Sequence, residues 1–213
     1  TDWYEWRVTV ADASPFSAGD DILLQGKCPH SGRPLVTKHT VTAKDGTTLW
    51  LDRQPRQNFW TDGEATVSSL FPLVTADNAA DIGVANLVLD GNRPESGYLD
   101  GNYGAAIFLQ DCERVAIDGI VARNMESDGL SFQIVHDLAV ENSTFADLRG
   151  NGIHPGSGSQ RPVIRRNTVR RCGCGIGWCW GVKYGFAEEN LIEECGTGIS
   201  IGHRDTDNVM RRN

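Results

Sequence analysis

The sequence predicts an all-β protein, most of which folds as a parallel β-helix with about 23 residues in each turn. Three observations lead to this prediction. A branched aliphatic residue recurs at that interval, an asparagine recurs at the same interval, and turn-forming residues separate the short β runs between them. A period in the low twenties with short strands is typical of a solenoid, in which each repeat stacks on its neighbours.

The aliphatic column advances by 23 residues at each step. Its members are Ile107, Leu130, Ile153, Ile176 and Ile199. A small residue precedes each of them, in the order Ala106, Gly129, Gly152, Gly175 and Gly198. The short runs that contain these aliphatic residues are expected to be strands. Each step is therefore interpreted as one rung of the β-helix.

The asparagine column has the same period. Asn167, Asn190 and Asn213 are 23 residues apart, Asn142 lies 25 residues before Asn167, and Gly119 lies 23 residues before Asn142. These residues follow short alternating runs that we expect to be strands, at residues 138–140, 163–165, 186–188 and 209–211. We predict a ladder at a turn, in which each side-chain amide bonds to the next rung, because polar groups buried at a bend need partners.

The first 78 residues do not follow the period. Strands are expected at residues 8–10, 21–24, 41–43 and 48–51, with turns at Asp-Gly pairs between them. We therefore predict two regions: a small N-terminal β cap or barrel-like region over residues 1–78, and the β-helix over residues 79–213. The tryptophans of the first region are either a carbohydrate platform or, more commonly, core and cap packing; they are Trp3, Trp6, Trp50 and Trp60.

The overall composition excludes two classes of partner. The formal net charge of −8 disfavours nucleic-acid binding, which needs a basic stripe. No apolar run approaches the length of a membrane span.

The final rung begins near residue 209 and the chain stops there, so we expect either a longer native protein or another subunit to cover the exposed strand edges. A homo-oligomer through this open end is one such arrangement.

Two of the six cysteines share a position in the repeat. Cys172 and Cys195 are 23 residues apart, so they are expected to lie on neighbouring rungs. Parallel strands are about 4.8 Å apart, which suits either side-by-side packing or a disulfide. A zinc site is disfavoured, because Cys172, Cys174 and Cys179 lack the usual paired spacing.

The repeated Gly-Ile or Gly-Leu pairs, the asparagine column and the segment at residues 86–92 resemble the right-handed parallel β-helix repeat proteins of the pectin lyase superfamily. The resemblance covers about residues 79–213. It implies a right-handed β-helix, and it implies export, with a secreted or cell-surface location. It does not imply one reaction, because this fold hosts lyases, hydrolases, epimerases and non-enzymatic adhesins.

Ionisable and aromatic residues gather on three consecutive rungs after residue 153. When the rungs are aligned on the aliphatic column, these residues come near one another at a strand-to-turn edge, within about 10 Å at the spacing of parallel strands. The proposed catalytic residues are His154, Lys183, His203, Arg204 and Asp205. The proposed substrate-binding residues are Trp178, Trp180, Tyr184, Gln160 and Arg161. Strand alternation places one of the two tryptophans in the solenoid core.

These residue types suit an acidic polysaccharide. Arg204 or Lys183 would bind a sugar carboxylate, and a tuned Lys183, His203, His154 or Tyr184 would remove the C5 proton in a β-elimination. A hydrolase would instead need two carboxylates about 5 to 9.5 Å apart.

Two aspartates offer that alternative. Asp205 and Asp207 are a candidate pair on one rung, with Asp128 or Asp137 on earlier rungs, and the Asp205–Asp207 spacing is also a weak signal for Ca²⁺. At a turn, however, aspartate commonly bonds its own backbone.

The sequence therefore predicts a secreted β-helix protein that cleaves a polysaccharide. We expect β-elimination of a uronate-containing glycan rather than hydrolysis, with no required cofactor. The alternative is a non-enzymatic glycan-binding, adhesin or structural module. Turnover and binding assays on single variants distinguish the two.

Overall fold

The computed structural model describes all 213 residues and divides into two compact units, Thr1–Phe71 and Pro72–Asn213. The division falls a few residues before the predicted boundary at residue 78. The reason is β6 (Val74–Asp77), which already pairs in parallel with β9 (Ala105–Gln110) and so belongs to the solenoid.

The first unit is a five-stranded antiparallel sheet in the order β1-β4-β3-β2-β5. Its strands are β1 (Arg7–Thr9), β2 (Asp21–Lys27), β3 (Pro34–Asp45), β4 (Thr48–Leu51) and β5 (Thr66–Ser68). Apolar side chains from alternate positions, such as Ile22, Leu24 and Leu49, form its own core. The predicted β-rich N-terminal region is thereby confirmed.

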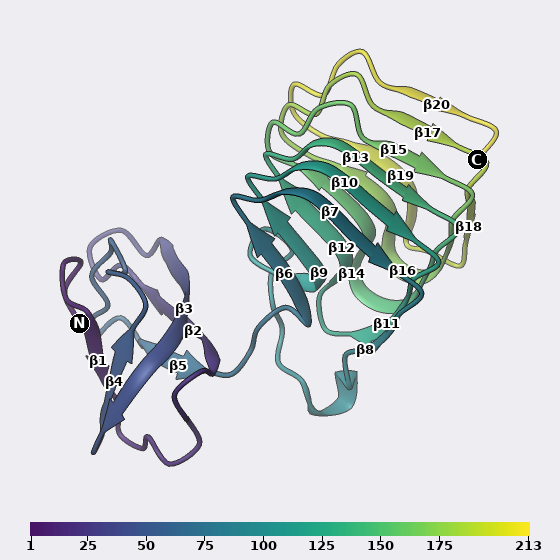
Figure 1. The fold of residues 1–213 in the computed structure, drawn as a ribbon. Coiled ribbons are helices and arrows are strands. Elements are labelled where there is room, and N and C mark those ends of the chain that lie inside the picture. The colour runs from purple at the N-terminus through teal and green to yellow at the C-terminus, as the bar shows by residue number, and fades with distance from the viewer. The chain divides into compact units, whose positions relative to one another are not determined.

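The second unit is a parallel β-helix (Figure 1). One sheet stacks β7 (Ala80–Ala85), β10 (Glu113–Asp118), β13 (His136–Glu141), β15 (Val163–Arg165), β17 (Phe186–Glu188) and β20 (Val209–Arg211). The other path contains β6, β9, β12 (Asp128–Gln133), β14 (Thr144–Gly156), β16 (Thr168–Trp178) and β18 (Leu191–Glu193). Three further strands lie beside this path: β11 (Val121–Met125) pairs with β14 and with β8 (Val88–Asp90), and β19 (Thr197–Ile201) pairs with β16.

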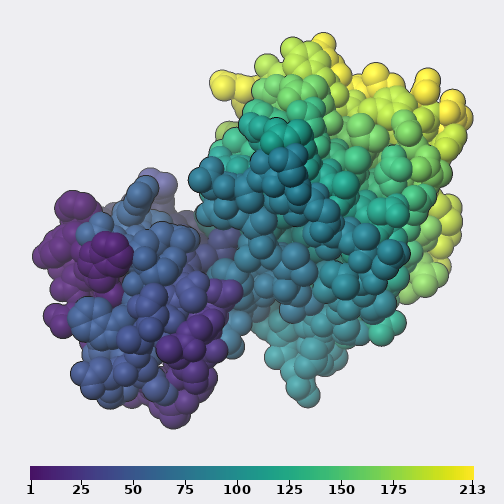
Figure 2. Space-filling view, viewed as in Figure 1, coloured from purple at the N-terminus to yellow at the C-terminus, as the bar shows by residue number.

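The two longest strands of the solenoid, β14 and β16, each run through two stretches of pairing. The first stretch of β14 pairs with β11, and its second stretch pairs with β12, with a register shift between Leu148 and Asn151 in its pairing with β16. Figure 2 shows the stacked rungs of the solenoid as successive bands of colour. The only helical element is a single turn, η1 (Arg93–Glu95), in the connection between β8 and β9. The structure contains no helix suited to crossing a membrane.

The strand register confirms the predicted period. Ile107, Leu130, Ile153, Ile176 and Ile199 are direct partners on successive strands. The first four are fully buried in the solenoid core. Aliphatic stacking thus aligns every rung, because a slip of one residue would turn these side chains to the outer surface.

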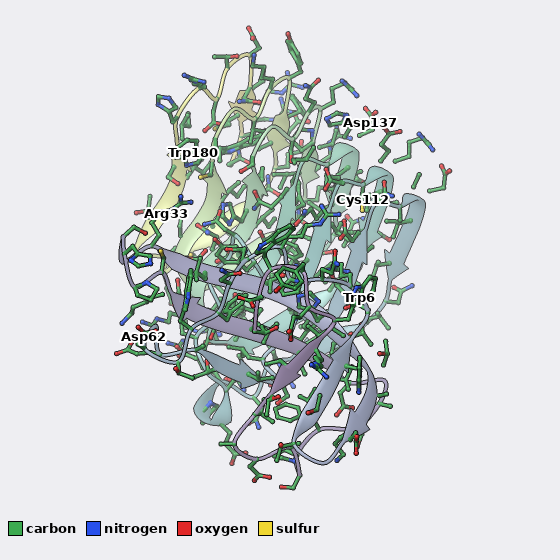
Figure 3. The ribbon with its side chains drawn as sticks, turned by 90° about the vertical axis from the view of Figure 1, so that its left-hand side faces the viewer. Trp6, Arg33, Asp62, Cys112, Asp137 and Trp180 are labelled. Atoms are coloured by element: carbon green, nitrogen blue, oxygen red, sulfur yellow. The ribbon has the colours of Figure 1, made fainter.

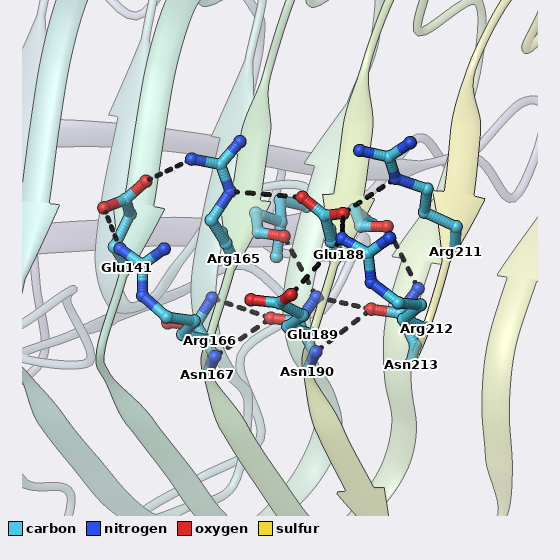
Figure 4. A network of polar contacts seen from close by, with 12 residues as sticks. Glu141, Arg165, Arg166, Asn167, Glu188, Glu189, Asn190, Arg211, Arg212 and Asn213 are labelled. Carbon is cyan, nitrogen blue, oxygen red and sulfur yellow. Dashed lines mark hydrogen bonds and ion pairs between the residues drawn. The ribbon is translucent and has the colours of Figure 1, made fainter.

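The asparagine ladder is present and is drawn in Figure 4. The backbone and side-chain amides of Asn167 both donate to Asn190 Oδ1 at 3.0 Å, and Asn190 bonds to Asn213 in the same way. Asn142, however, is not a member, so that part of the prediction was wrong. Strand pairing aligns Ser143 with Asn167, and Ser143 donates its backbone N–H to Asn167 Oδ1, whereas Asn142 donates to Asp118.

The stacked cysteines pack as thiols. All six cysteines are free, and Cys172 and Cys195 each donate a hydrogen bond to the backbone carbonyl two residues before them. Burial, followed by the proximity of Cys195, raises the pKa of the Cys172 thiol to about 12. Of the two predicted arrangements, packing is the one observed.

Candidate functional site

The outer surface of strands β12, β14 and β16 is lined with polar side chains. Leu130 and Phe132 of β12 belong to the core, whereas the alternate residues Ser131 and Gln133 do not, although they are also buried. This surface continues onto Cys179, directly after β16, and onto β19. We call the whole the outer face and define it by these residues: Asp128, Ser131, Gln133, Asn151, His154, Cys174, Gly177, Cys179 and Ser200. The strand register aligns Phe108, Ser131, His154, Gly177 and Ser200 as one column, directly after the aliphatic column.

A buried histidine–carboxylate pair lies at the centre of the outer face. His154 Nδ1 is 2.7 Å from Asp128 Oδ2, and both side chains are less than a tenth exposed. The other contacts of Asp128 come from Asn151, whose backbone N–H and side-chain amide donate to the two carboxylate oxygens at 2.6 and 3.1 Å. Asp128 is thus held by several donors in one orientation.

The connection between β8 and β9 covers this pair. Ser131 donates its hydroxyl hydrogen bond to the Gly101 carbonyl, and Ser127 donates to the Gly104 carbonyl. A β-carbon at Gly101 would collide with the Asp128 carboxylate, so only glycine lets the segment lie so close. This cover removes Asp128 from solvent.

The pair keeps a proton on the imidazole. Burial by itself lowers the pKa of His154, but its hydrogen bonds to Asp128 and Cys179, and their charges, raise that pKa to about 9. His154 is therefore an imidazolium at neutral pH, able to attract an anion or donate a proton. It is not a free base at that pH.

Two glycines near His154, Gly156 and Gly177, make room for polar side chains of the preceding rung. A β-carbon at Gly156 would collide with the Gln133 amide, and one at Gly177 would collide with Asn151 Oδ1. The Gln133 side chain therefore occupies the space beside Gly156, and the Asn151 side chain occupies the space beside Gly177. The result is a polar surface next to the imidazole.

The predicted aromatic residues flank the outer face in different ways. Trp180, labelled in Figure 3, is 64% exposed. Its ring centroid lies 5.6 Å from that of His203 on the following rung. Tyr184 is also exposed. Trp178, by contrast, is 1% exposed in the solenoid core, so its predicted contact with substrate is wrong.

Three more of the predicted site residues are held by hydrogen bonds or ion pairs to other parts of the β-helix. Asp205 accepts hydrogen bonds from the backbone N–H groups of Val182 and Gly202 at 2.7 and 2.8 Å, which fixes a turn. Arg161 makes a two-pronged ion pair with Asp137, and Gln160 pairs through its backbone with Lys183. The Asp205 carboxylate is thus committed to the backbone.

The remaining predicted residues lie at the surface. Lys183 is partly exposed, and Arg204 and Asp207 are exposed turn residues with positive φ. No three His, Cys, Asp or Glu side chains converge into a metal-binding group. The Ca²⁺ hypothesis for Asp205 and Asp207 stays a prediction.

Sequence reasoning missed the partners of His154. Asp128 was considered only as a distant carboxylate for hydrolysis, Asn151 was not considered, and Cys179 was weighed only as a metal ligand. One signal was available: Asp128 and Asn151 are 23 residues apart, so the repeat already placed them on neighbouring rungs.

A family comparison agrees with this architecture. The family of right-handed β-helix regions matches residues 82–213, more than half of the chain. The chain belongs to this family. No curated protein sequence matches it.

Solved structures of three phage tailspikes are similar to this β-helix protein. The Gp54 tailspike of Acinetobacter baumannii bacteriophage AP22, in complex with A. baumannii capsular saccharide, is 13% identical, with a TM-score of 0.33, over 95% of this chain and 43% of the tailspike. The Pseudomonas phage phi297 tailspike gp61 is 13% identical over 90% of this chain and 45% of its own, with a TM-score of 0.31.

The tailspike gp49 from Pseudomonas phage LKA1 is 12% identical over 92% of this chain and 45% of its own, with a TM-score of 0.31. The chain thus spans less than half the length of these tailspikes.

Proposed function

We propose that this protein binds an acidic polysaccharide along the outer face and cleaves it by β-elimination. The observation that carries the proposal is the buried His154–Asp128 ion pair, in which the Asp128 carboxylate keeps the His154 imidazole protonated within a polar surface. In this scheme the other ring N–H of the imidazolium donates a hydrogen bond to a sugar carboxylate and stabilises the negative charge that develops when the C5 proton leaves.

The same strip of rungs offers a platform for a sugar ring. Trp180 presents an exposed aromatic face, and apolar sugar faces stack on such rings. Lys183 and Arg204, on the rungs of Trp180 and His203, supply further positive charge for an acidic polymer. Binding therefore extends from the outer face to the neighbouring turns.

The base in this scheme is His203. Because His154 already carries a proton at neutral pH, the proton acceptor must be a different group. His203 is exposed and lies against Trp180, where the sugar would stack, and histidine is the commonest general base in enzymes. Lys183 and Tyr184 are the other bases within this strip.

Hydrolysis fits the site less well than elimination. A glycosidase needs one carboxyl group as acid and another as base or nucleophile. Asp128 is held by Asn151 and His154, and Asp205 is held by two backbone N–H groups, so neither is free to transfer a proton to the glycosidic oxygen. A glycan-binding module without turnover remains the second candidate, supported by the exposed Trp180.

The test is a screen against uronate-containing and neutral polysaccharides, which records both unsaturated-product absorbance and new reducing ends. We expect both signals with a uronate polymer. His154→Gln and His203→Gln should each lower the elimination rate by about 100-fold or more. His136→Gln is the matched control, because His136 lies on β13, outside the outer face, and should leave the rate unchanged.

The other outcomes overturn the proposal in distinct ways. Reducing ends without unsaturated product would mean hydrolysis. Binding that Trp180→Ala weakens, without either product, would mean a glycan-binding module. A circular-dichroism melt of each variant checks that lost activity is not lost fold, and the exposed position of His203 makes that variant the safest one to interpret.

A further inference from the structure

We propose that the side chains of Trp3, Tyr4 and Trp6 form a carbohydrate-binding platform in the first unit, on which pyranose rings of a polysaccharide stack. We call these three side chains the aromatic platform. The inference rests on the proposed function only for the identity of the polymer, because the aromatic platform binds sugar and does not cleave it.

All three rings of the aromatic platform are exposed. Trp3, Tyr4 and Trp6 are 57%, 52% and 50% exposed, and Trp6 is labelled in Figure 3. Aromatic rings are large apolar surfaces, and exposed apolar patches commonly mark binding sites. Of the two roles that the sequence allows for these tryptophans, packing inside the unit is excluded for Trp3 and Trp6.

A tight turn presents the first two rings. Trp3 and Tyr4 are the central residues of this turn, which is closed by the Glu5 N–H donating to the Asp2 carbonyl at 3.1 Å. Their rings meet edge to face, with centroids 5.4 Å apart and planes 85° apart. The two rings therefore support one another in the absence of any ligand.

The chain after β4 holds this turn in place. Trp3 donates its backbone N–H to Asn58 Oδ1 at 2.7 Å, and its carbonyl accepts from the Arg56 N–H at 3.1 Å. The side-chain amide of Gln54 donates to the Tyr4 carbonyl at 2.9 Å. Because the turn is already ordered, a ligand that stacks on it loses little binding free energy to ordering the protein.

The fourth exposed ring of this unit, Trp50, is not part of the aromatic platform. The Leu51 N–H donates to the Trp6 carbonyl at 2.8 Å, and the next residue, Arg7, is the direct strand partner of Trp50. Successive side chains of an extended chain point to opposite faces of a sheet, so Trp50 lies on the face of Arg7 and not on that of Trp6. The Arg7 guanidinium lies over the Trp50 ring, 5.8 Å from its centroid.

The chemistry of the exposed side chains favours a glycan as the ligand. Every large apolar side chain that is exposed in the first unit is a Trp or Tyr, whereas those exposed in the β-helix also include Leu, Ile and Val. A sugar ring has a flat C–H face and a rim of hydroxyl groups. Trp and Tyr match both, because each combines a flat apolar ring with an N–H or O–H group.

The first experiment is affinity electrophoresis of the full chain. Each gel contains one polysaccharide: polygalacturonate, alginate or hyaluronan as uronate polymers, and galactomannan or hydroxyethyl cellulose as neutral ones. All proteins carry Trp180→Ala, so that the exposed ring of the β-helix does not contribute. We expect at least one polymer to retard the protein, and Trp3→Ala and Trp6→Ala should each weaken that binding by about 10-fold.

Trp50→Ala is the matched control. It removes an exposed tryptophan from the same unit, but one that lies on the other face of the sheet. This variant should leave the retardation unchanged. A circular-dichroism melt of each variant shows whether a loss of binding reflects a loss of fold.

A second readout locates the contact on the unmodified protein. The chain has six tryptophans, and each indole N–H gives its own NMR signal, which the single variants assign. Oligosaccharides of the retarding polymer should shift the signals of Trp3 and Trp6. Trp178, which is 1% exposed in the solenoid core, is the internal reference and should not move.

Four results would overturn the inference: no retardation by any polymer, retardation that survives both Trp3→Ala and Trp6→Ala, an equal loss with Trp50→Ala, or unshifted signals of Trp3 and Trp6. If no polymer retards the protein but Trp3→Ala abolishes self-association in sedimentation, the surface binds protein instead.

The failure of this inference is distinguishable from that of the proposed function. Electrophoresis and NMR report on the aromatic platform even if no product forms. The unsaturated-product assay reports on elimination even if no polymer retards the protein. Retardation by a neutral polymer alone would support the aromatic platform and separate its ligand from the acidic polysaccharide proposed for the outer face.

Discussion

Each unit contains a buried histidine that contacts an aspartate, and the pKa values of the two histidines are shifted in opposite directions. In the antiparallel sheet, His39 Nδ1 lies 3.1 Å from Asp52, and in the β-helix His154 Nδ1 lies 2.7 Å from Asp128. Burial, only partly opposed by Asp52, lowers the pKa of His39. The pKa of His154 is instead raised to about 9, although burial opposes that rise.

The surroundings of the carboxylate explain the difference. Asp52 is partly exposed and also forms an ion pair with Arg53 at 2.8 Å, so much of its charge is already compensated. Asp128 is buried, and apart from His154 its bonds come from the uncharged Asn151. A carboxylate next to a histidine therefore does not by itself make an imidazolium; the carboxylate must also be isolated from solvent and from other cations.

The largest expected effect on stability follows the removal of the Asp128 carboxylate. Asp128→Asn should lower the free energy of unfolding of the β-helix by about 3 to 5 kcal/mol, because it leaves a buried imidazole without its counter-charge. Asp52→Asn, in the first unit, should cost about 1 kcal/mol or less, since that carboxylate is partly exposed. Urea unfolding followed by signals specific to each unit measures both. Equal losses would remove the contrast between the pairs.

The next effect is an opposite pH dependence of the two units. A raised pKa in the folded state stabilises below the unfolded value, and this contribution is lost as pH rises. His154 should therefore contribute up to about 3 kcal/mol below pH 6.5 that disappears as pH rises towards 9.

His39, with its lowered pKa, should act in the other direction. Its contribution is present above the unfolded value and is lost as pH falls below it. Hydrogen exchange resolved by unit, together with an NMR titration of the imidazole signals, measures both trends. Parallel trends in the two units would contradict the assignment.

The smallest expected effect tests whether Arg53 contributes to the lowered pKa of His39. Arg53→Ala removes the cation that shares Asp52, so the pKa of His39 should rise by less than about one unit, a change worth about 1 kcal/mol or less. Lys27→Ala, which removes an exposed cation that pairs with Glu64, is the control for the titration. A fall in the pKa of His39 would show that Arg53 does not compete for Asp52.

The repeat determined much of the fold from the sequence alone. The columns that begin at Ile107 and Asn167 predicted the rung length, the parallel register and the ladder, because a stack of equal turns places residues one period apart side by side. Asn142 shows where that reasoning fails. One rung there is a residue longer, so Ser143 takes the ladder position, and only strand pairing reveals which residue is extra.

The alternation of side chains along a strand did not show which of two tryptophans is buried. It predicted that one of Trp178 and Trp180 is in the core, and the register selects Trp178. The boundary that the sequence predicted, at residue 78, lies after β6 for a related reason. β6 is too short to show a period, and only its pairing with β9 shows that it belongs to the solenoid.

The sequence by itself therefore determined the class of fold, the stacking register and the rungs on which chemistry is concentrated, because all three follow from a period along the chain. Only the tertiary structure decided that the pKa of His154 is raised and that of His39 is lowered. That depends on Asp128 being buried beneath the segment at Gly101, and on Asn151 and Cys179 meeting the pair from neighbouring rungs. Burial and hydrogen bonding are set in three dimensions, and they are what shift a pKa.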